Sequence, residues 1–445
     1  MSTDGSHLLW LTLGAIALLL TLILWAKLHA FLALMLSSMA LGLAAGMAPT
    51  KLLKSIQAGF GEALGFIAVV VALGAMIGQF LEHSGGGRKL AEWLLGKFGR
   101  DRAAWAVLTA AFLIGLPIFF EVGFIILVPL AWSLARESKR SLLFYALPIA
   151  CALTVTHAMV PPHPAPSAAA QLLGADLGKT ILYGILVSIP MAIAGGIMYG
   201  LWIAGKVFVP VPEIASRHSE SADTADAPSV PLVLLLLLLP VLMIFASTIA
   251  DMTTKSAGGF FAFIGHPFTA LMVTALAAMY FFGARRGLDR STIATMATKS
   301  LEPMGSLLAI MGGGGAFKQV IVDSGVGPYA GNLLASSAVS PLLVAYLVAS
   351  ALRIAQGSAT VAIITGAGIV APLVKGIPGY SPEMLVLALC AGGTILSHVN
   401  DAGFWLVNQM TGMTVPQTLR TWTVMKVITS VVGIAIILVV QAMVS

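Results

Sequence analysis

Apolar runs separated by short polar links dominate the chain. Tracts such as 232–239 are apolar on every face, and the runs lack the period-two alternation of membrane β-strands. Runs of this length and number predict an all-α polytopic membrane protein, with nearly the whole chain in the bilayer. The predicted segments are 8–26, 29–47, 62–81, 103–117, 122–135, 141–159, 179–205, 230–250, 262–283, 300–322, 342–355, 358–374, 382–399 and 421–441.

Composition excludes a water-soluble globule, because 58% of the 445 residues are hydrophobic and only 9% are charged, against about 25% in soluble domains. The net charge of +6 comes from Lys and Arg beside apolar segments, which indicates membrane topology and no nucleic-acid partner. Cys151 and Cys390 both lie inside apolar segments, so neither a disulfide framework nor a zinc site is expected.

The two halves of the chain resemble each other. The pattern His-x-Phe-x-Ala-Leu-Met occurs at 29–35 and again at 266–272. A constant offset of 240 residues then matches Glu62 with Glu302, Gly74 with Gly314, Gln79 with Gln319, Ser84 with Ser324, Gly85 with Gly325 and Thr154 with Thr394. We interpret the chain as a duplication, with repeats at 1–210 and 230–445 and a polar cytoplasmic linker at 211–229.

Each repeat contains seven apolar segments, of which the fourth and fifth have only about 14–17 residues, short for separate membrane crossings. We expect these two segments to form a re-entrant hairpin. Five or seven crossings per repeat are both odd numbers, so the second repeat is predicted to be inverted relative to the first. The predicted fold is therefore two inverted repeats, each with spanning helices, a re-entrant hairpin and an interrupted helix.

The distribution of basic residues predicts the orientation. If the N-terminus lies outside, most Lys and Arg residues in the links fall on the cytoplasmic side, as the positive-inside rule requires. Both termini are then periplasmic.

Four polar interruptions mark the candidate site: 115–123, 154–164, 353–360 and 394–403. Non-helical backbone persists at membrane depth only where protein or a water-filled cavity satisfies it. The interruptions form two pairs under the duplication, a hairpin tip and a broken helix in each repeat. We expect them to converge near the midplane, where helix N-termini favour an anion.

Two acids are candidates for proton coupling. Glu121 lies between two apolar arms with no basic residue nearby in sequence, and Asp401 precedes a predicted helix start. Intramembrane carboxyls of this kind are functional candidates that take and release protons. The alternative is a structural role for both, as caps that bind backbone N–H groups.

Arg353, at the end of a short apolar arm, is the candidate carboxylate ligand, since guanidinium binds carboxylate through two parallel hydrogen bonds. The alternative is an internal ion pair with Glu121 or Asp401. Ser358 and Thr360 offer hydroxyl groups to a polyhydroxylated molecule, or serve only as helix starters.

Polar residues of the two broken helices complete the candidate set. His157 and His398 occupy matched positions and are candidates for substrate or proton handling, with a buried structural histidine as the alternative. Ser397 and Asn400 are candidate substrate ligands. No metal set is recognisable, because the histidines lack helical spacing and acidic or thiol partners. The glycine run 312–315 lacks the remainder of a phosphate loop and predicts close helix packing.

The chain resembles the gluconate permease family of proton symporters over essentially its full length. The tracts that carry the resemblance are 29–46, 59–86, 119–123, 160–164, 314–320, 323–326, 352–354, 357–361, 397–401 and 404–406. The resemblance implies a dimeric carrier that takes up gluconate or a related sugar acid with protons across the bacterial inner membrane, without a cofactor. A sodium-coupled carboxylate carrier, or a carrier of another small acid such as D-serine, remains an alternative. Neither a Gly-x-Ser-x-Gly nor a His-Glu-x-x-His motif occurs, so an enzyme is not expected.

Overall fold

The computed structural model describes residues 5–212, 227–254, 259–302, 304–325, 339–374, 379–398 and 401–444, and every regular element in these ranges is helical. Most of the predicted linker and Asn400 lie outside the described residues. Six helices are long and apolar enough to cross a membrane, and further apolar helices are shorter. The six are Pro49–His83, Leu143–Leu173, Leu177–Ala204, Pro267–Arg286, Met304–Asp323 and Val415–Met443. The predicted all-α polytopic membrane fold is confirmed.

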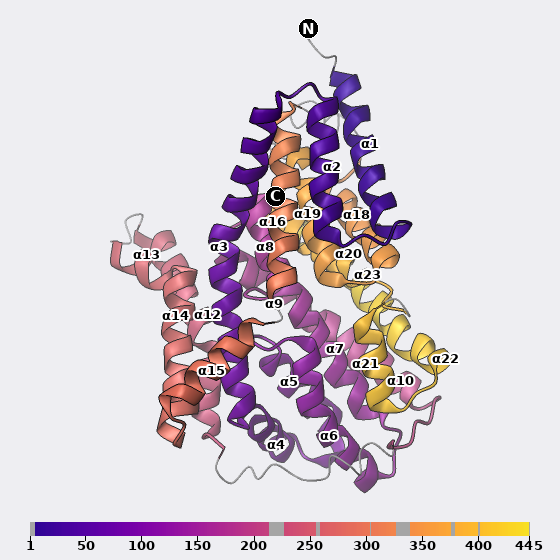
Figure 1. The fold of residues 1–445 in the computed structure, drawn as a ribbon. Helices are drawn as coiled ribbons and strands as arrows, with labels where there is room; N and C mark the ends of the chain where they lie inside the picture. The colour runs from indigo at the N-terminus through magenta and orange to yellow at the C-terminus, as the bar shows by residue number, and fades with distance from the viewer. Residues whose placement is uncertain are drawn as a thin grey trace.

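The first half of the chain contains a long helix, a hairpin of one 12-residue helix and one 19-residue helix, and an interrupted helix (Figure 1). Its elements are α1 Gly5–Leu24, α2 Ala30–Ala44, α3 Pro49–His83, α4 Gly86–Phe98, α5 Ala103–Ile114, α6 Phe120–Ser138, α7 Leu143–Met159, α8 Pro164–Leu173, and α9 Leu177–Ala192 continuing through η2 Ile193–Tyr199 into α10 Gly200–Ala204. The segment predicted at 62–81 is longer than expected, and α4 was not predicted. The break between α7 and α8 is confined to 160–163.

The second half follows the same order. Its elements are α12 Val230–Thr254, α13 Gly259–Gly265, α14 Pro267–Ala278 with η3 Met279–Gly283 and η4 Ala284–Arg286, α15 Arg290–Leu301, α16 Met304–Asp323, α18 Pro341–Gln356, α19 Ala359–Val374, α20 Pro382–Gly393, α21 Ala402–Thr411, α22 Val415–Thr418, η5 Leu419–Thr423 and α23 Val424–Val444. The helix predicted over 382–399 ends earlier than expected, at Gly393.

Matched positions of the two halves adopt matched local geometry. His29 and His266 both cap a helix, since Nδ1 of each accepts from the backbone N–H two residues on, at 3.3 and 3.2 Å. Ser84 and Ser324 each donate to a carbonyl three residues earlier, at 2.9 and 2.8 Å, and a glycine with φ of +70° or +85° follows each. These shared capping details support the duplication, whose division into two repeats stays a prediction.

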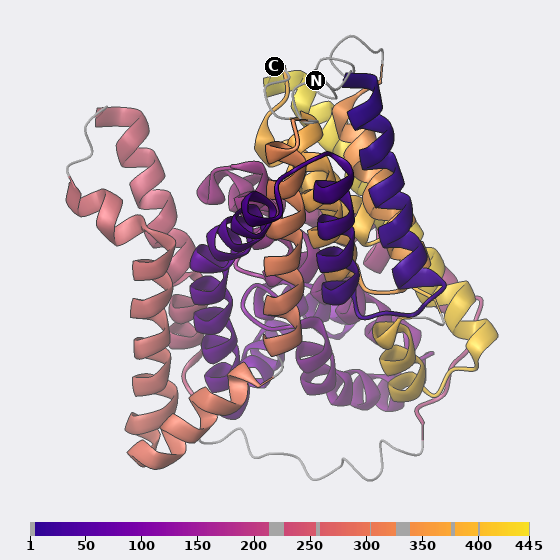
Figure 2. The ribbon, with the colours of Figure 1, turned by 45° about the horizontal axis from the view of Figure 1, so that its top comes forward.

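The two hairpins approach the centre from opposite ends. In Figure 1, α5 and α6 occupy the lower half of the molecule, whereas α18 and α19 occupy the upper half. The start of α1 and the end of α23 lie toward the same, upper end (Figures 1 and 2). This arrangement is the one expected of inverted repeats with both termini on one side.

Cation–aromatic pairs mark the lower end, at α4, the α6–α7 link, α10 and η4 (Figure 1). Their distances from charge to ring centroid are 5.8 Å for Lys97 and Trp93, 5.5 Å for Arg140 and Phe144, 4.1 Å for Lys206 and Trp202, and 5.9 Å for Arg285 and Phe281. Basic and aromatic residues gather at membrane boundaries, so these pairs are consistent with the lower end as the predicted cytoplasmic side.

Helices α3 and α16, which correspond under the duplication, pack directly against each other. Their backbones meet at Gly59 and Gly315: a Cβ added at either glycine would lie 2.4 Å from the carbonyl oxygen of the other. Beside this contact, Gly312 faces the ring of Phe60. The glycine run therefore serves close helix packing, as predicted.

We expect Gly315→Ala to destabilise the fold by about 1–3 kcal/mol, because the new methyl group has to push the α3 backbone away. The measurement is thermal unfolding of the purified protein in detergent. Gly305→Ala on the same helix is the matched control, since a Cβ there meets nothing within 4 Å. Equal melting temperatures for the two variants would contradict the close packing.

Candidate functional site

Both hairpin tips and both broken helices contribute to one cavity of about 280 Å³. The helices α6, α19 and α21 begin at its wall, so the N-terminal ends of three helices face the same space. The lining residues are Phe120, Glu121, Thr154, His157, Ala158, Arg353, Gly357, Ser358, Ala359, Thr360, Asp401, Ala402, Gly403, Trp422 and Lys426. The cavity therefore combines the predicted convergence with a polar lining and helix ends that favour an anion.

An ion pair between Arg353 and Asp401 lies in the wall of this cavity. Arg353 is 2% exposed, and Nη2 donates to Asp401 Oδ2 while Nη1 donates to the carbonyl of Gly357, one turn further on. Its Nε is buried without a hydrogen-bond partner among the described residues. The internal ion pair considered as an alternative for Arg353 is thus present, and its Nε–H is left without a hydrogen-bond partner.

Asp401 is held from several sides. Its Oδ1 accepts from the backbone N–H of Gly403 at 3.0 Å, so the residue caps α21. Its Oδ2 also accepts from Ser397, whose own oxygen accepts from Trp422 Nε1 at 2.7 Å. Thr423 donates to the Ser397 carbonyl at 2.5 Å. These bonds stabilise the carboxylate as the counter-ion of Arg353.

Glu121 differs from Asp401 in that it forms no ion pair within the described part of the chain. It lies in the first turn of α6, directly after the hairpin tip, and its side chain is exposed to the cavity. A carboxyl that faces a protein cavity without a fixed counter-ion is free to bind and release a proton. Of the two predicted acids, Glu121 has the geometry of a proton carrier.

The rings of His157 and His163 lie next to each other, 4.6 Å apart, beside Phe119 of the hairpin tip. His163 bonds to the Gly115 carbonyl at 2.6 Å, which ties α8 to the tip. Nδ1 of His157 is buried and has no hydrogen-bond partner among the described residues. Of these two histidines, His157 lines the cavity and His163 does not. His163 therefore serves to hold the hairpin tip through its bond to Gly115.

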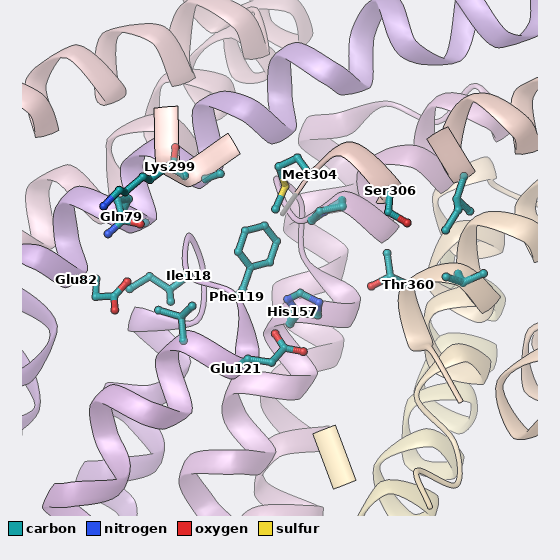
Figure 3. A pocket seen from close by; sticks show the side chains of 17 residues that line it. Gln79, Glu82, Ile118, Phe119, Glu121, His157, Lys299, Met304, Ser306 and Thr360 are labelled. Atoms are coloured by element: carbon teal, nitrogen blue, oxygen red, sulfur yellow. The ribbon is translucent and has the colours of Figure 1, made fainter. Parts of the chain in front are cut away.

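A second cavity, of about 540 Å³, adjoins the first and shares Glu121, His157 and Thr360 with it. The side chains of Glu121 and His157 point into it, and Gln79, Glu82 and Lys299 line it elsewhere (Figure 3). We call this second cavity the passage and the first cavity the site. Glu121 thus lies at the junction of the passage and the site.

The remaining predicted ligands divide into two groups. Ser358 and Thr360 line the site, and Ser358 also accepts the Val361 N–H at 3.3 Å, as a helix starter does. Ser397 and His398 do not line it: Ser397 holds Asp401, and His398 bonds to the Ile354 carbonyl at 3.1 Å. Among the described residues no group of His, Cys, Asp and Glu could hold a metal ion.

Sequence reasoning missed Lys426. This lysine of α23 is 3% exposed, lines the site, and lies 5.7 Å from the centre of the Trp422 ring. A signal was present, because a single charged residue in the apolar segment 421–441 is a functional candidate by default. Trp422 and Thr154, which also line the site, carried no such signal.

Comparisons with known proteins agree with this architecture. Residues 6–444 match the model of the GntP family permeases. A gluconate permease of Pseudomonas aeruginosa is 44% identical over 98% of both chains, and a high-affinity gluconate transporter of Escherichia coli strain K12 is 39% identical over 95% of this chain and 96% of that one. The structure of Neisseria gonorrhoeae MtrF, at 15% identity, shares the fold with a TM-score of 0.64 over 87% of this chain and 83% of that one. The chain belongs to the GntP permease family.

Proposed function

We propose that this protein is a secondary carrier that takes up gluconate or a related sugar acid together with protons. It acts in the bacterial inner membrane, as a homodimer with both termini in the periplasm. The orientation rests on the basic residues of the lower end, and the dimer rests on the family resemblance. The observation that carries the proposal is the joint lining of one cavity by Arg353, Glu121 and the Ser358–Thr360 tip.

The cavity fits a small polyhydroxylated anion. Arg353 keeps donors beyond the two that bind Asp401 and Gly357, and three helix N-termini add partial positive charge. The hydroxyls of Ser358, Thr360 and Thr154 line the same space and match the hydroxyl groups of a sugar acid. Asn400 remains a proposed ligand on the sequence alone.

The placement of Glu121 supports proton coupling. An ionised carboxylate at the junction of the site and the passage repels an anionic substrate, and its protonation removes that repulsion. Substrate and proton then favour each other's binding, which is the reciprocal coupling that a symporter needs. Asp401 is instead held as the ion-pair partner of Arg353.

The direct test is uptake of radiolabelled gluconate into proteoliposomes under an imposed proton gradient. Sugar acids and D-serine serve as unlabelled competitors. Accumulation that follows the proton gradient and is removed by a protonophore is expected. Accumulation that follows only a sodium gradient would instead establish the sodium-coupled alternative.

We expect Glu121→Gln to lose proton-driven accumulation while keeping exchange of labelled for unlabelled gluconate, because the amide is neutral like the protonated acid but cannot release a proton. Both activities are measured in the same proteoliposomes. Glu137→Gln, at an exposed surface ion pair with Arg100, is the control. Full accumulation by Glu121→Gln would remove this residue from the coupling mechanism.

We expect Arg353→Lys to weaken gluconate binding by about 10- to 100-fold. Lysine keeps the positive charge but loses the fork of donors, and a hydrogen bond to a charged group contributes about 1.5–3 kcal/mol. The measurement is KM for uptake, with Arg88→Lys in the surface pair with Glu92 as the control. An unchanged KM would show that the guanidinium does not bind the substrate.

A further inference from the structure

The site holds two cations and two carboxyl groups. Arg353 from α18 and Lys426 from α23 supply the positive charges, and Glu121 from α6 and Asp401 before α21 supply the negative ones. His157 from α7 is the remaining titratable group in the lining, and it is counted as neutral at pH 7, where an unperturbed imidazole is mostly uncharged. With both acids ionised, the empty site has a net charge of zero.

Lys426 is the cation of this set that is not committed to an ion pair. Arg353 is paired with Asp401, whereas the four ion pairs found in the described residues do not include Lys426. Its side chain is 3% exposed and reaches the cavity beside Trp422. The other charged or titratable groups near it are Cys151 and His157 of α7, Arg353 and Asp401. A buried ammonium without a fixed partner is costly, so a role in binding an anion explains its presence.

We propose that Lys426 is a second substrate cation beside Arg353, and that the balanced charges of the site fix the coupling at one proton per monocarboxylate, so that transport is electroneutral. This inference rests on the proposed function. A sugar-acid anion alone would give the loaded site a net charge of −1. One proton on Glu121 returns the net charge to zero, and a second proton would raise it to +1.

The electrostatic cost of a net charge favours those states of the site in which the charges sum to zero. A net charge held at membrane depth is unfavourable, whereas a fully paired set of charges is tolerated. The empty site with both acids ionised and the site loaded with one anion and one proton are both neutral. Both steps that switch access to the site between the two sides of the membrane therefore carry no net charge, and the membrane potential does no work on the cycle.

The accumulation ratio in proteoliposomes tests the stoichiometry. With one proton per gluconate, a gradient of one pH unit supports an accumulation of about tenfold at equilibrium, and a potassium diffusion potential set with valinomycin leaves that ratio unchanged. Two protons per gluconate would give about 100-fold and a further rise with an inside-negative potential, which would overturn the inference but leave proton symport standing. No response to the pH gradient would refute the proposed function itself.

Lys426→Gln tests the role of the lysine. Without this charge, a neutral loaded site requires protons on both Glu121 and Asp401, so gluconate KM at pH 7 is expected to rise at least tenfold and to recover as the pH is lowered. Lys426→Arg, which keeps the charge, is expected to retain most of the affinity. Lys206→Gln, at the boundary beside Trp202, is the matched control.

A structural role of Lys426 would produce a different result. If Lys426→Gln changes only the melting temperature, or raises KM equally at every pH, the lysine is not a substrate cation. If Lys426→Gln does not fold, Lys426→Arg and the wild-type accumulation ratio carry the test. A Lys426→Arg variant as impaired as the glutamine variant, or a wild-type ratio that follows the membrane potential, would then overturn the inference.

Discussion

The buried ion pair between Arg353 and Asp401 is the constraint on which the centre of the molecule depends. Removing a guanidinium and a carboxylate from water is costly, and their attraction compensates only when further hydrogen bonds satisfy both groups. Here the carbonyl of Gly357 and the hydroxyl of Ser397 supply them. Because these partners come from a hairpin tip and a helix break, the ion pair explains why the backbone is interrupted at this depth.

The two halves share the order of their helices but differ in the charges that they bring to the centre. Both halves have a hairpin and a broken helix, and matched residues cap matched helices. The charges, however, differ: the second half contributes Arg353, Asp401 and Lys426, while the first contributes Glu121 and His157. The cavity between the two tips therefore has its cations from one half and, from the other, Glu121, its carboxyl group that is unpaired within the described ranges.

The sequence predicts most of this centre, and the exceptions have physical reasons. Hairpins and breaks are visible because glycine, proline and charge interrupt an otherwise apolar pattern, and Glu121 and Arg353 stand out for the same reason. Helix α4 was not predicted because it is too polar for a membrane-spanning segment. Its apolar residues form a face only when they are placed at the 3.6-residue period of a helix. Ser397 and His398 were expected in the cavity, but the direction of a side chain at a helix break depends on tertiary contacts that the pattern does not contain.

The two matched helices α3 and α16 show how a symmetric sequence reaches an asymmetric state. Gln79 lines the passage, which shares residues with the site, whereas its counterpart Gln319 lines a separate cavity of about 660 Å³ that shares none within the described residues. The matched glycines differ in the same sense: a Cβ added at Gly314 would lie 3.3 Å from the side chain of Ile364, whereas a Cβ added at the equivalent Gly74 has its nearest neighbour, Pro162, at 3.8 Å. The asymmetry therefore comes from the neighbours of these helices, because matched positions hold the same residue types in different surroundings.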